Sequence, residues 1–394
     1  MSEWNFSKNK HLLWRAGFGP NMGSLHTAEE ISTKSLLRVL FKDSAAVPVF
    51  IDVADPDIKQ QYAITPVAMS SMAQRRRQMQ DSIGTRDTDQ RSSENNRRRL
   101  AQKSRENIKQ LNLEWLNQMA NSNQQLREKI SLFWHGHFAA NSGNILHQQL
   151  LLDVIRKNAL GNFGDLLMAV SKSGSMITYL NNNQNRKNRP NENFARELME
   201  LFTLGRGNYT ESDVKEAARS FTGWGTNPAG EFVFRKQQHD SGSKSFLGKE
   251  GNFNGDDIIR ILLEQKQTAI YLTTKIYRFY VNENVDSKRV SQLADVFFNS
   301  GYDIAKLLQS IFESDWFYAQ ENTGNRIKSP VELLVGLRRN LELDIENGQV
   351  QLLFQRLLGQ LLFYPPNVAG WPGGRSWIDS STPAAIPCAC LQAR

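Results

Sequence analysis

NNNQNRKNRPNENFARELMELFTLGRGNYTESDVKEAARSFTGW, residues 181–224, carries the clearest signals for the fold of this chain of 394 residues. Pro190 suits the first turn of a helix, where its missing N–H is not needed, and Gly205 suits the left-handed position just after a helix end. Thr210 is a typical N-cap residue, and Gly223 is suited to end the helix that follows. The stretch therefore predicts two consecutive helices that pack as an αα-hairpin.

The first of these helices, over 190–205, is predicted to be amphipathic. At about 100° per residue, its apolar face is formed by Phe194, Leu198 and Leu201. Glu197 and Glu200 lie on a separate polar face, where their i and i+3 spacing makes them neighbours. The two carboxylates therefore point either to solvent or into a polar cavity.

Helical periodicity recurs along most of the chain, and only one run alternates as a strand does. The predicted helices are 9–16, 31–42, 100–121, 126–134, 144–158, 162–180, 190–205, 210–222, 255–264, 266–282, 287–299, 303–313, 328–343 and 347–358. The run EFVFRKQQHD, at 231–240, is the best strand candidate. The pattern predicts an all-α protein with at most one small β-hairpin near 231–240.

A basic segment interrupts this pattern. Residues 73–98 combine high charge with few large apolar side chains, so we expect a mobile insertion or loop there. It separates N-terminal helices, in 1–98, from a main helical body, 99–394, within one continuous domain. Across 75–109 the chain has eleven Lys or Arg against five acidic residues, which allows weak binding of nucleic acid or another polyanion. A solvated helix and loop is the more ordinary interpretation, because no aromatic residue interleaves the charges.

Composition places the chain among soluble globular proteins, with 40% hydrophobic and 22% charged residues. No run approaches the roughly 20 apolar residues of a membrane span. The N-terminal sequence lacks the features of a secretion signal, so we expect a cytoplasmic protein, with export alongside a partner left open. Cys388 and Cys390 are too close for an easy disulfide and too few for a structural zinc site.

Several motifs carry a resemblance to a known family. They are HLLWRAGFGP (11–20), FWHGHF (133–138), NEN (191–193), AREL (195–198), TLG (203–205), YT (209–210), DV (213–214), TGW (222–224), HD (239–240), LG (247–248), KSPVELL (328–334) and PPNVAGWPGG (365–374). Together they resemble the signature of the domain-of-unknown-function 1800 family, a bacterial family without an established activity. The resemblance spans nearly the whole chain.

The resemblance has three further implications. Many family members carry a His where this chain has Phe202, so a site that depends on that imidazole is altered here. Members are often encoded beside proteins of the domain-of-unknown-function 1501 family, which suggests such a protein as a partner. Members usually continue with Leu-rich, Arg-containing sequence where this chain ends in STPAAIPCACLQAR, so we expect a truncated or frameshifted tail.

Three of the matching segments contribute polar groups that suggest a site. In an unbroken helix His137 would face the interior and His135 would point about 180° away, toward solvent. If Gly136 breaks the helix, the His-x-His spacing suits a metal ion. Buried, hydrogen-bonded histidines are the more ordinary interpretation of this pair. His239 and Asp240 lie in a Gly- and Ser-rich loop, where sites are often found.

These groups predict one cleft in which His135, His137 and His239 bind a divalent transition metal, Zn, Mn or Fe. Such an ion would activate water for hydrolysis, with Glu197, Glu200 and Asp240 as the catalytic carboxylates. The alternative is a non-catalytic binding or assembly protein that acts with a partner or an anionic polymer. A Ser-His-Asp arrangement around His239 is a third and weaker alternative, because no nucleophile elbow is present.

Overall fold

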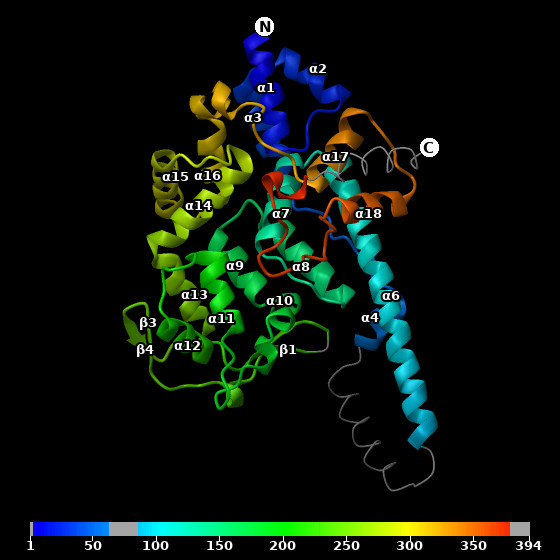
Figure 1. The fold of residues 1–394 in the computed structure, drawn as a ribbon, viewed down its shortest axis with the longest axis vertical. Helices are drawn as coiled ribbons and strands as arrows, with labels where there is room; N and C mark the ends of the chain where they lie inside the picture. Colours follow the sequence, from blue (N-terminus) through cyan, green and yellow to red (C-terminus); the bar gives the residue numbers. More distant parts are fainter. Residues whose placement is uncertain (1–2, 63–85, 228, 379–394) are drawn as a thin grey trace.

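The computed structural model describes residues 3–62, 86–227 and 229–378. The all-α class is confirmed, since helices make up nearly all of the regular structure (Figure 1). The described residues form two small antiparallel hairpins where at most one was expected: β1 (Trp224–Thr226) pairs with β2 (Phe232–Phe234), and β3 (Lys244–Phe246) pairs with β4 (Lys249–Gly251). None of the described helices is both long enough and apolar enough to cross a membrane.

The helical bounds follow the predicted pattern closely from residue 255 onward. In chain order the α-helices are α1 (Glu3–Ala16), α2 (Met22–Glu30), α3 (Thr33–Ser44), α4 (Pro56–Tyr62), α6 (Arg86–Asn121), α7 (Gln125–His137), α8 (Ile145–Asn158), α9 (Phe163–Ser171), α10 (Gly174–Tyr179), α11 (Asn193–Glu197), α12 (Glu211–Ser220), α13 (Gly255–Glu264), α14 (Lys266–Tyr280), α15 (Ser287–Asn299), α16 (Ile304–Phe312), α17 (Pro330–Asn340) and α18 (Gly348–Leu357). Short helical turns are η1 (Asn182–Gln184), η2 (Leu198–Thr203), η3 (Lys236–Gln238), η4 (Asp315–Tyr318), η5 (Gln320–Asn322) and η6 (Gly374–Trp377).

Helix α7 is the central element of the fold. Every residue of α7 except Gly136 is buried, and the helix lies in the middle of the body (Figure 1). One side of α7 packs into the larger apolar core, which α1, α3 and α8 to α16 complete. The other side contributes Leu132 to a second core, formed with α6, α17 and α18. An α-helix enclosed in this way has no solvent-exposed face.

Residues 181–224, the signature stretch, fold as a helical hairpin with two departures from the prediction. The first helix begins at Asn193, so Pro190 lies before it and not in its first turn. At Leu198 this helix changes from α-helix into π-helix. Gly205 ends it with a φ of 80°, the left-handed conformation that the sequence predicted. Thr210 then caps α12, and its side chain and that of Asp213 form a capping box.

Helix α6 begins earlier than expected and projects from the body (Figure 1). The loop predicted over 73–98 is wrong from Arg86 onward, where the chain is helical; the rest of that segment lies outside the described residues. Within the segment Glu94 and Arg98 form an i,i+4 ion pair, and just after it Asp57 of α4 forms ion pairs with Arg99 and Lys103. These charges are paired along a helix, which the composition of the segment alone does not reveal.

Candidate functional site

His135 is buried, with 1% of its surface exposed. Its Nε2 accepts a hydrogen bond from the Phe363 N–H at 3.2 Å, and its ring lies 5.1 Å from Trp115 and 5.2 Å from Trp371. Burial lowers the pKa of His135 to about 3, so the ring is neutral. Because Nε2 accepts this hydrogen bond, its lone pair is already in use.

His137 is buried on the opposite side of α7, against the larger core. The Lys275 Nζ donates to His137 Nδ1 at 2.9 Å, and His137 Nε2 lies 3.2 Å from the carbonyl oxygen of Phe202. An ammonium has no lone pair and a carbonyl has no proton, so Nδ1 is the acceptor and Nε2–H the donor. Burial and the charge of Lys275 hold the pKa of His137 well below its usual range.

The unbroken helix places the two histidines on opposite sides of α7, as its periodicity requires. The expected exposure of His135 is nevertheless wrong. The side that it occupies is covered by α6 and by the loop that carries Phe363 and Trp371. Burial with hydrogen bonds, the more ordinary interpretation of this pair, therefore describes both rings.

The two carboxylates of the signature helix differ in their surroundings. Glu200 accepts from Arg206 at 2.6 Å and from the Tyr209 hydroxyl at 2.9 Å, and the hydrogen bond from Arg206 is the main cause of its lowered pKa. Glu197 is half-buried, and its pKa is raised first by burial and then by the charge of Glu200. Glu197 thus resembles a carboxyl group suited to proton transfer, whereas Glu200 is held in an ion pair.

His239 and Asp240 belong to a third environment, beside α12. His239 Nδ1 donates to the Thr222 carbonyl oxygen at 2.9 Å. Asp240 forms an ion pair with Arg219 at 2.8 Å, and the hydrogen bond from Arg219 is the main cause of its lowered pKa. These contacts fix the loop against the end of α12.

His239 and Asp240 both contact Thr222, whereas His135, His137 and Glu200 have other hydrogen-bond partners. Within residues 3–62, 86–227 and 229–378, no group of three or more His, Cys, Asp or Glu side chains is arranged to hold a metal ion. The lone pairs of His135 and His137 that a metal would need accept hydrogen bonds instead. The metal roles of His135, His137 and His239, and the catalytic roles of the carboxylates, stay predictions.

His137 nevertheless leads to a cavity, because its partner Lys275 lines one. The cavity has a volume of about 680 Å³ and lies between α7, α14 and the segment 373–376; we call it the α7–α14 cavity. Its lining residues are Phe133, Lys275, Arg278, Phe279, Glu283, Arg326, Ile327, Gly373, Gly374, Arg375 and Ser376. Four basic side chains and one carboxylate therefore surround it.

Lys275 is one of the two partly buried basic groups on this wall. Its ammonium lies 2.9 Å from His137 Nδ1 and 5.3 Å from the centre of the Tyr271 ring. Burial lowers the pKa of Lys275 to about 8. No described carboxylate forms an ion pair with it, so the remaining N–H groups are available to a ligand.

Arg326 differs from the other basic groups because its charge is neutralised. It donates to both oxygens of Glu332, at 2.7 and 2.9 Å, and Lys129 binds the same carboxylate at 2.5 Å. Burial alone would raise the pKa of Glu332, but these two cations hold it well below its usual range. Arg278 and Arg375 form no ion pair with a described residue, and Glu283 is the single carboxylate on the cavity wall.

The sequence reasoning missed Lys275, Arg278 and Arg375. One signal was available for Lys275, which stands between Leu272 and Ile276 in the apolar pattern of its helix. A second signal was the Gly-rich motif 365–374, which supplies part of the cavity wall. Neither signal indicated which elements the folded chain would bring together.

Comparison with known proteins agrees with these motifs. The model of the family described as "Protein of unknown function (DUF1800)" matches residues 11–386, which is nearly the entire chain. No curated protein and no solved structure matches the chain. The matched region includes α7, α14 and the segment 373–376, so the α7–α14 cavity lies within it. The chain belongs to the DUF1800 family.

Proposed function

We propose that this protein is a binding protein whose α7–α14 cavity holds an anionic ligand. The observation that supports this function is a set of three cations, Lys275, Arg278 and Arg375, around one cavity with a single carboxylate. None of the three forms an ion pair with a described residue. Lys275 is partly buried, and a cation in a partly enclosed site attracts anions more strongly than a cation in open water; Arg278 and Arg375 are exposed and add their charge at the rim. A bound anion would therefore supply the counter-charge that these three cations lack among the described residues.

The ligand should also have an apolar part. The rings of Phe133 and Phe279 lie 5.3 Å apart on the cavity wall, beside Ile327. A volume of about 680 Å³ falls within the roughly 300–1,000 Å³ range of small-molecule pockets. We therefore infer an aromatic or branched aliphatic carboxylate, sulfonate or phosphate as the ligand class.

Two matched dyes test this proposal. 8-Anilinonaphthalene-1-sulfonate is anionic and N-phenyl-1-naphthylamine is its neutral counterpart, so their affinities separate charge from apolar contact. We expect Lys275→Met and Arg278→Gln each to weaken binding of the sulfonate about tenfold, or about 1.4 kcal/mol. Binding of the neutral dye should change little.

The control is Lys288→Gln, which removes one charge from the exposed start of α15. Fluorescence titration at constant ionic strength measures all three variants. Equal affinity of the wild type and of both cavity variants for the sulfonate would overturn the proposal.

The metal-dependent hydrolase stays a second candidate, because Glu197 combines partial burial with a raised pKa beside a second carboxylate. Elemental analysis of the purified protein tests it directly. Less than about 0.1 equivalent of Zn, Mn or Fe, before and after incubation with each ion, would argue against this candidate.

Two partner hypotheses are separate from both candidates. One is a protein of the domain-of-unknown-function 1501 family, and the other is polyanion binding through 75–109. Co-purification of the two proteins tests the first. Retention on heparin, compared between the full chain and a variant with Arg97, Arg98 and Arg99 changed to Gln, tests the second.

A further inference from the structure

A second cavity, about 320 Å³ in volume, lies between α1 and the segment 323–328. Its lining residues are Ser7, Lys10, His11, Trp14, Arg15, Thr323, Gly324, Arg326 and Lys328. Four are Lys or Arg, one is His, and none of these nine carries a carboxylate. We call it the α1 cavity.

The cations of the α1 cavity outnumber the carboxylates near them. The charge of the buried carboxylate Glu332 acts on Arg15 and Lys328, but Arg326 and Lys129 already bind it directly. Arg15, which is 6% exposed, donates to the Asn322 carbonyl oxygen at 2.9 Å and to Asn325 Oδ1 at 3.0 Å. Both of these hydrogen-bond partners of Arg15 are uncharged, and no described carboxylate forms an ion pair with it.

The charge of Lys328 likewise has no direct carboxylate partner. Its ammonium lies 4.0 Å from the centre of the Trp14 ring, a cation–π contact. No described carboxylate forms an ion pair with it. Burial lowers the pKa of Lys328 and that of Arg15, the latter to about 10. Neighbouring arginines lower both pKa values further, and the charge of Glu332 offsets part of this effect. An anion between Arg15 and Lys328 would relieve this repulsion.

His11 adds a buried hydrogen-bonding atom to the same cavity. The side chain is 7% exposed, and its Nε2 has no hydrogen-bond partner among the described residues. Burial and the charge of Arg15 lower the pKa of His11 to about 4. A hydrogen bond with the Phe317 backbone, in which a ring N–H donates to the carbonyl, raises this pKa by a smaller amount. At neutral pH Nε2 is therefore an acceptor, and its missing partner is a donor.

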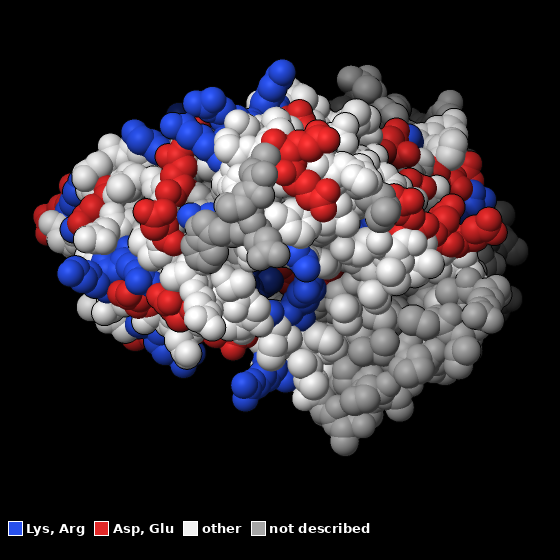
Figure 2. Space-filling model, turned by 90° about the horizontal axis from the view of Figure 1, so that it is seen from above, with Lys and Arg blue, Asp and Glu red and all other residues white. Residues whose placement is uncertain are grey.

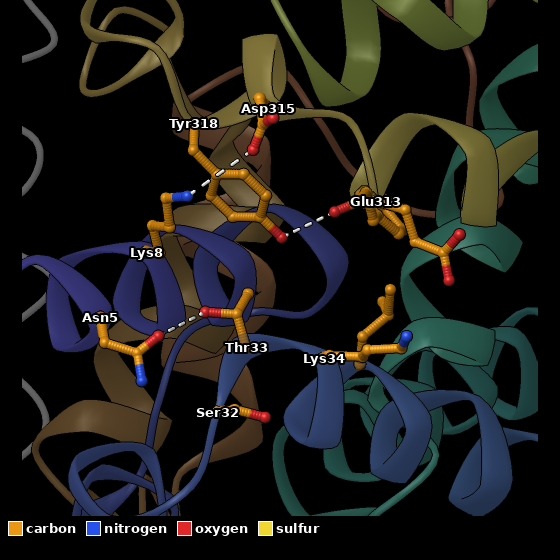
Figure 3. A pocket seen from close by; sticks show the side chains of 10 residues that line it. Asn5, Lys8, Ser32, Thr33, Lys34, Glu313, Asp315 and Tyr318 are labelled. Atoms are coloured by element: carbon orange, nitrogen blue, oxygen red, sulfur yellow. Dashed lines mark hydrogen bonds and ion pairs between the residues drawn. The ribbon is translucent and has the colours of Figure 1, made fainter. Parts of the chain in front are cut away.

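The neighbouring cavity between α1, α3 and η4 shows the opposite arrangement (Figure 3). It is lined by Lys8 and Lys34 but also by Glu313 and Asp315, and Lys8 lies 3.9 Å from Asp315. Seen from above, acidic and basic side chains are likewise interspersed over the described surface (Figure 2). The charge imbalance is therefore a property of the α1 cavity and not of this whole end of the molecule.

We propose that the α1 cavity is a second binding site, specific for a compact oxyanion that retains a hydroxyl proton, of which hydrogen phosphate is the simplest example. The anionic oxygens would lie between Arg15 and Lys328. The hydroxyl would donate to His11 Nε2, the acceptor that has no partner. Sulfate has the same shape and charge but no proton at neutral pH, so it would leave that acceptor unpaired.

Titration at pH 7 with sodium phosphate and with sodium sulfate, at equal ionic strength, tests this site. Isothermal calorimetry and the 31P resonance of phosphate provide two independent readouts. The wild type should bind phosphate at least tenfold more tightly than sulfate. Equal affinity for the two anions, or no binding of phosphate, would overturn the proposal.

Two variants assign the roles of the residues. Lys328→Met should weaken binding of both anions at least tenfold. His11→Phe keeps a ring against Phe317 but removes the acceptor, so it should reduce the preference for phosphate over sulfate to about one. Circular dichroism without ligand checks that each variant folds. If a variant does not fold, the comparison of phosphate with sulfate binding to the wild type still decides the proposal.

Two controls separate this site from other sources of binding. Lys236→Gln removes an exposed charge at η3, outside the residues that line the α1 cavity, and should leave phosphate binding unchanged. Lys275→Met alters the α7–α14 cavity and should also leave it unchanged, so failure of one site does not imply failure of the other. Loss of phosphate binding in either control would contradict the assignment to the α1 cavity.

Discussion

Lys275 Nζ lies 2.9 Å from His137 Nδ1, so a lysine of α14 occupies the lone pair that a metal ion would need on this histidine. The contact joins the central helix to the α7–α14 cavity. Burial lowers the pKa of both groups, and the charge of Lys275 lowers that of His137 further. The chemistry of His137 is thus determined by a residue 138 positions away.

The buried ammonium of Lys275 predicts a dependence of stability on pH. Its pKa in the folded state, about 8, lies below the usual lysine value of 10.5. The charged ammonium therefore destabilises the folded state below pH 8, and this penalty is lost as the pH rises to about 10.5. The wild type should gain about 3 kcal/mol of unfolding free energy from this group across that window. Lys275→Met should not show this gain. Urea unfolding at pH 7.5, 9 and 10 measures the difference, and an identical slope in both proteins would contradict it.

Glu332→Gln is predicted to destabilise the protein strongly. The carboxylate is 1% exposed and serves both Lys129 and Arg326, so its removal leaves two buried cations without their partner. We expect a loss of about 3–5 kcal/mol. Because the pKa of Glu332 is lowered in the folded state, its contribution should also disappear as the pH falls through that lowered value.

The matched control for this change is Glu211→Gln, which removes the carboxylate of an exposed ion pair with Arg196. It should cost less than about 1 kcal/mol. Urea unfolding at pH 7 compares the two variants, and similar losses would show that burial does not determine the effect.

Gly205→Ala is predicted to disrupt the turn of the signature hairpin. Gly205 has a φ of 80°, and an added Cβ would lie 2.7 Å from Cδ2 of Tyr271. Gly207 has a φ of 85° but open space around it, so Gly207→Ala isolates the conformational cost, about 1–2 kcal/mol. Thermal unfolding should show a larger loss for Gly205→Ala. Equal losses would show that Tyr271 moves aside freely.

Phe202→His tests the residue at which this chain differs from many relatives. Phe202 is buried, and its ring lies 5.8 Å from that of His137 and 5.3 Å from that of Phe138. An imidazole in this aromatic cluster should cost about 1–3 kcal/mol unless it finds a partner. Urea unfolding measures the loss. Recovery of stability on addition of Zn²⁺, absent in the wild type, would instead favour a metal site at this position.

Much of the fold could be predicted because local signals determine where helices begin and end. The N-cap at Thr210, the left-handed Gly205 and the 3.6-residue periodicity act within a few residues of each other, and the structure confirms the resulting elements. The periodicity of α7 also correctly separated His135 and His137 onto opposite sides of one helix. These features depend on backbone geometry alone.

The sites could not be predicted in the same way. Periodicity states which side of α7 a residue occupies, but not that α6 and the Phe363 loop cover the side of His135. Nor does sequence spacing bring His11 beside Lys328, or Lys275 to His137. Burial, pKa and hydrogen-bond partners depend on which elements pack together, because desolvation and charge act through space between residues far apart in the chain. The sequence by itself determined most of the helices and the family, and only the tertiary structure decided which of the described cations lack a counter-charge.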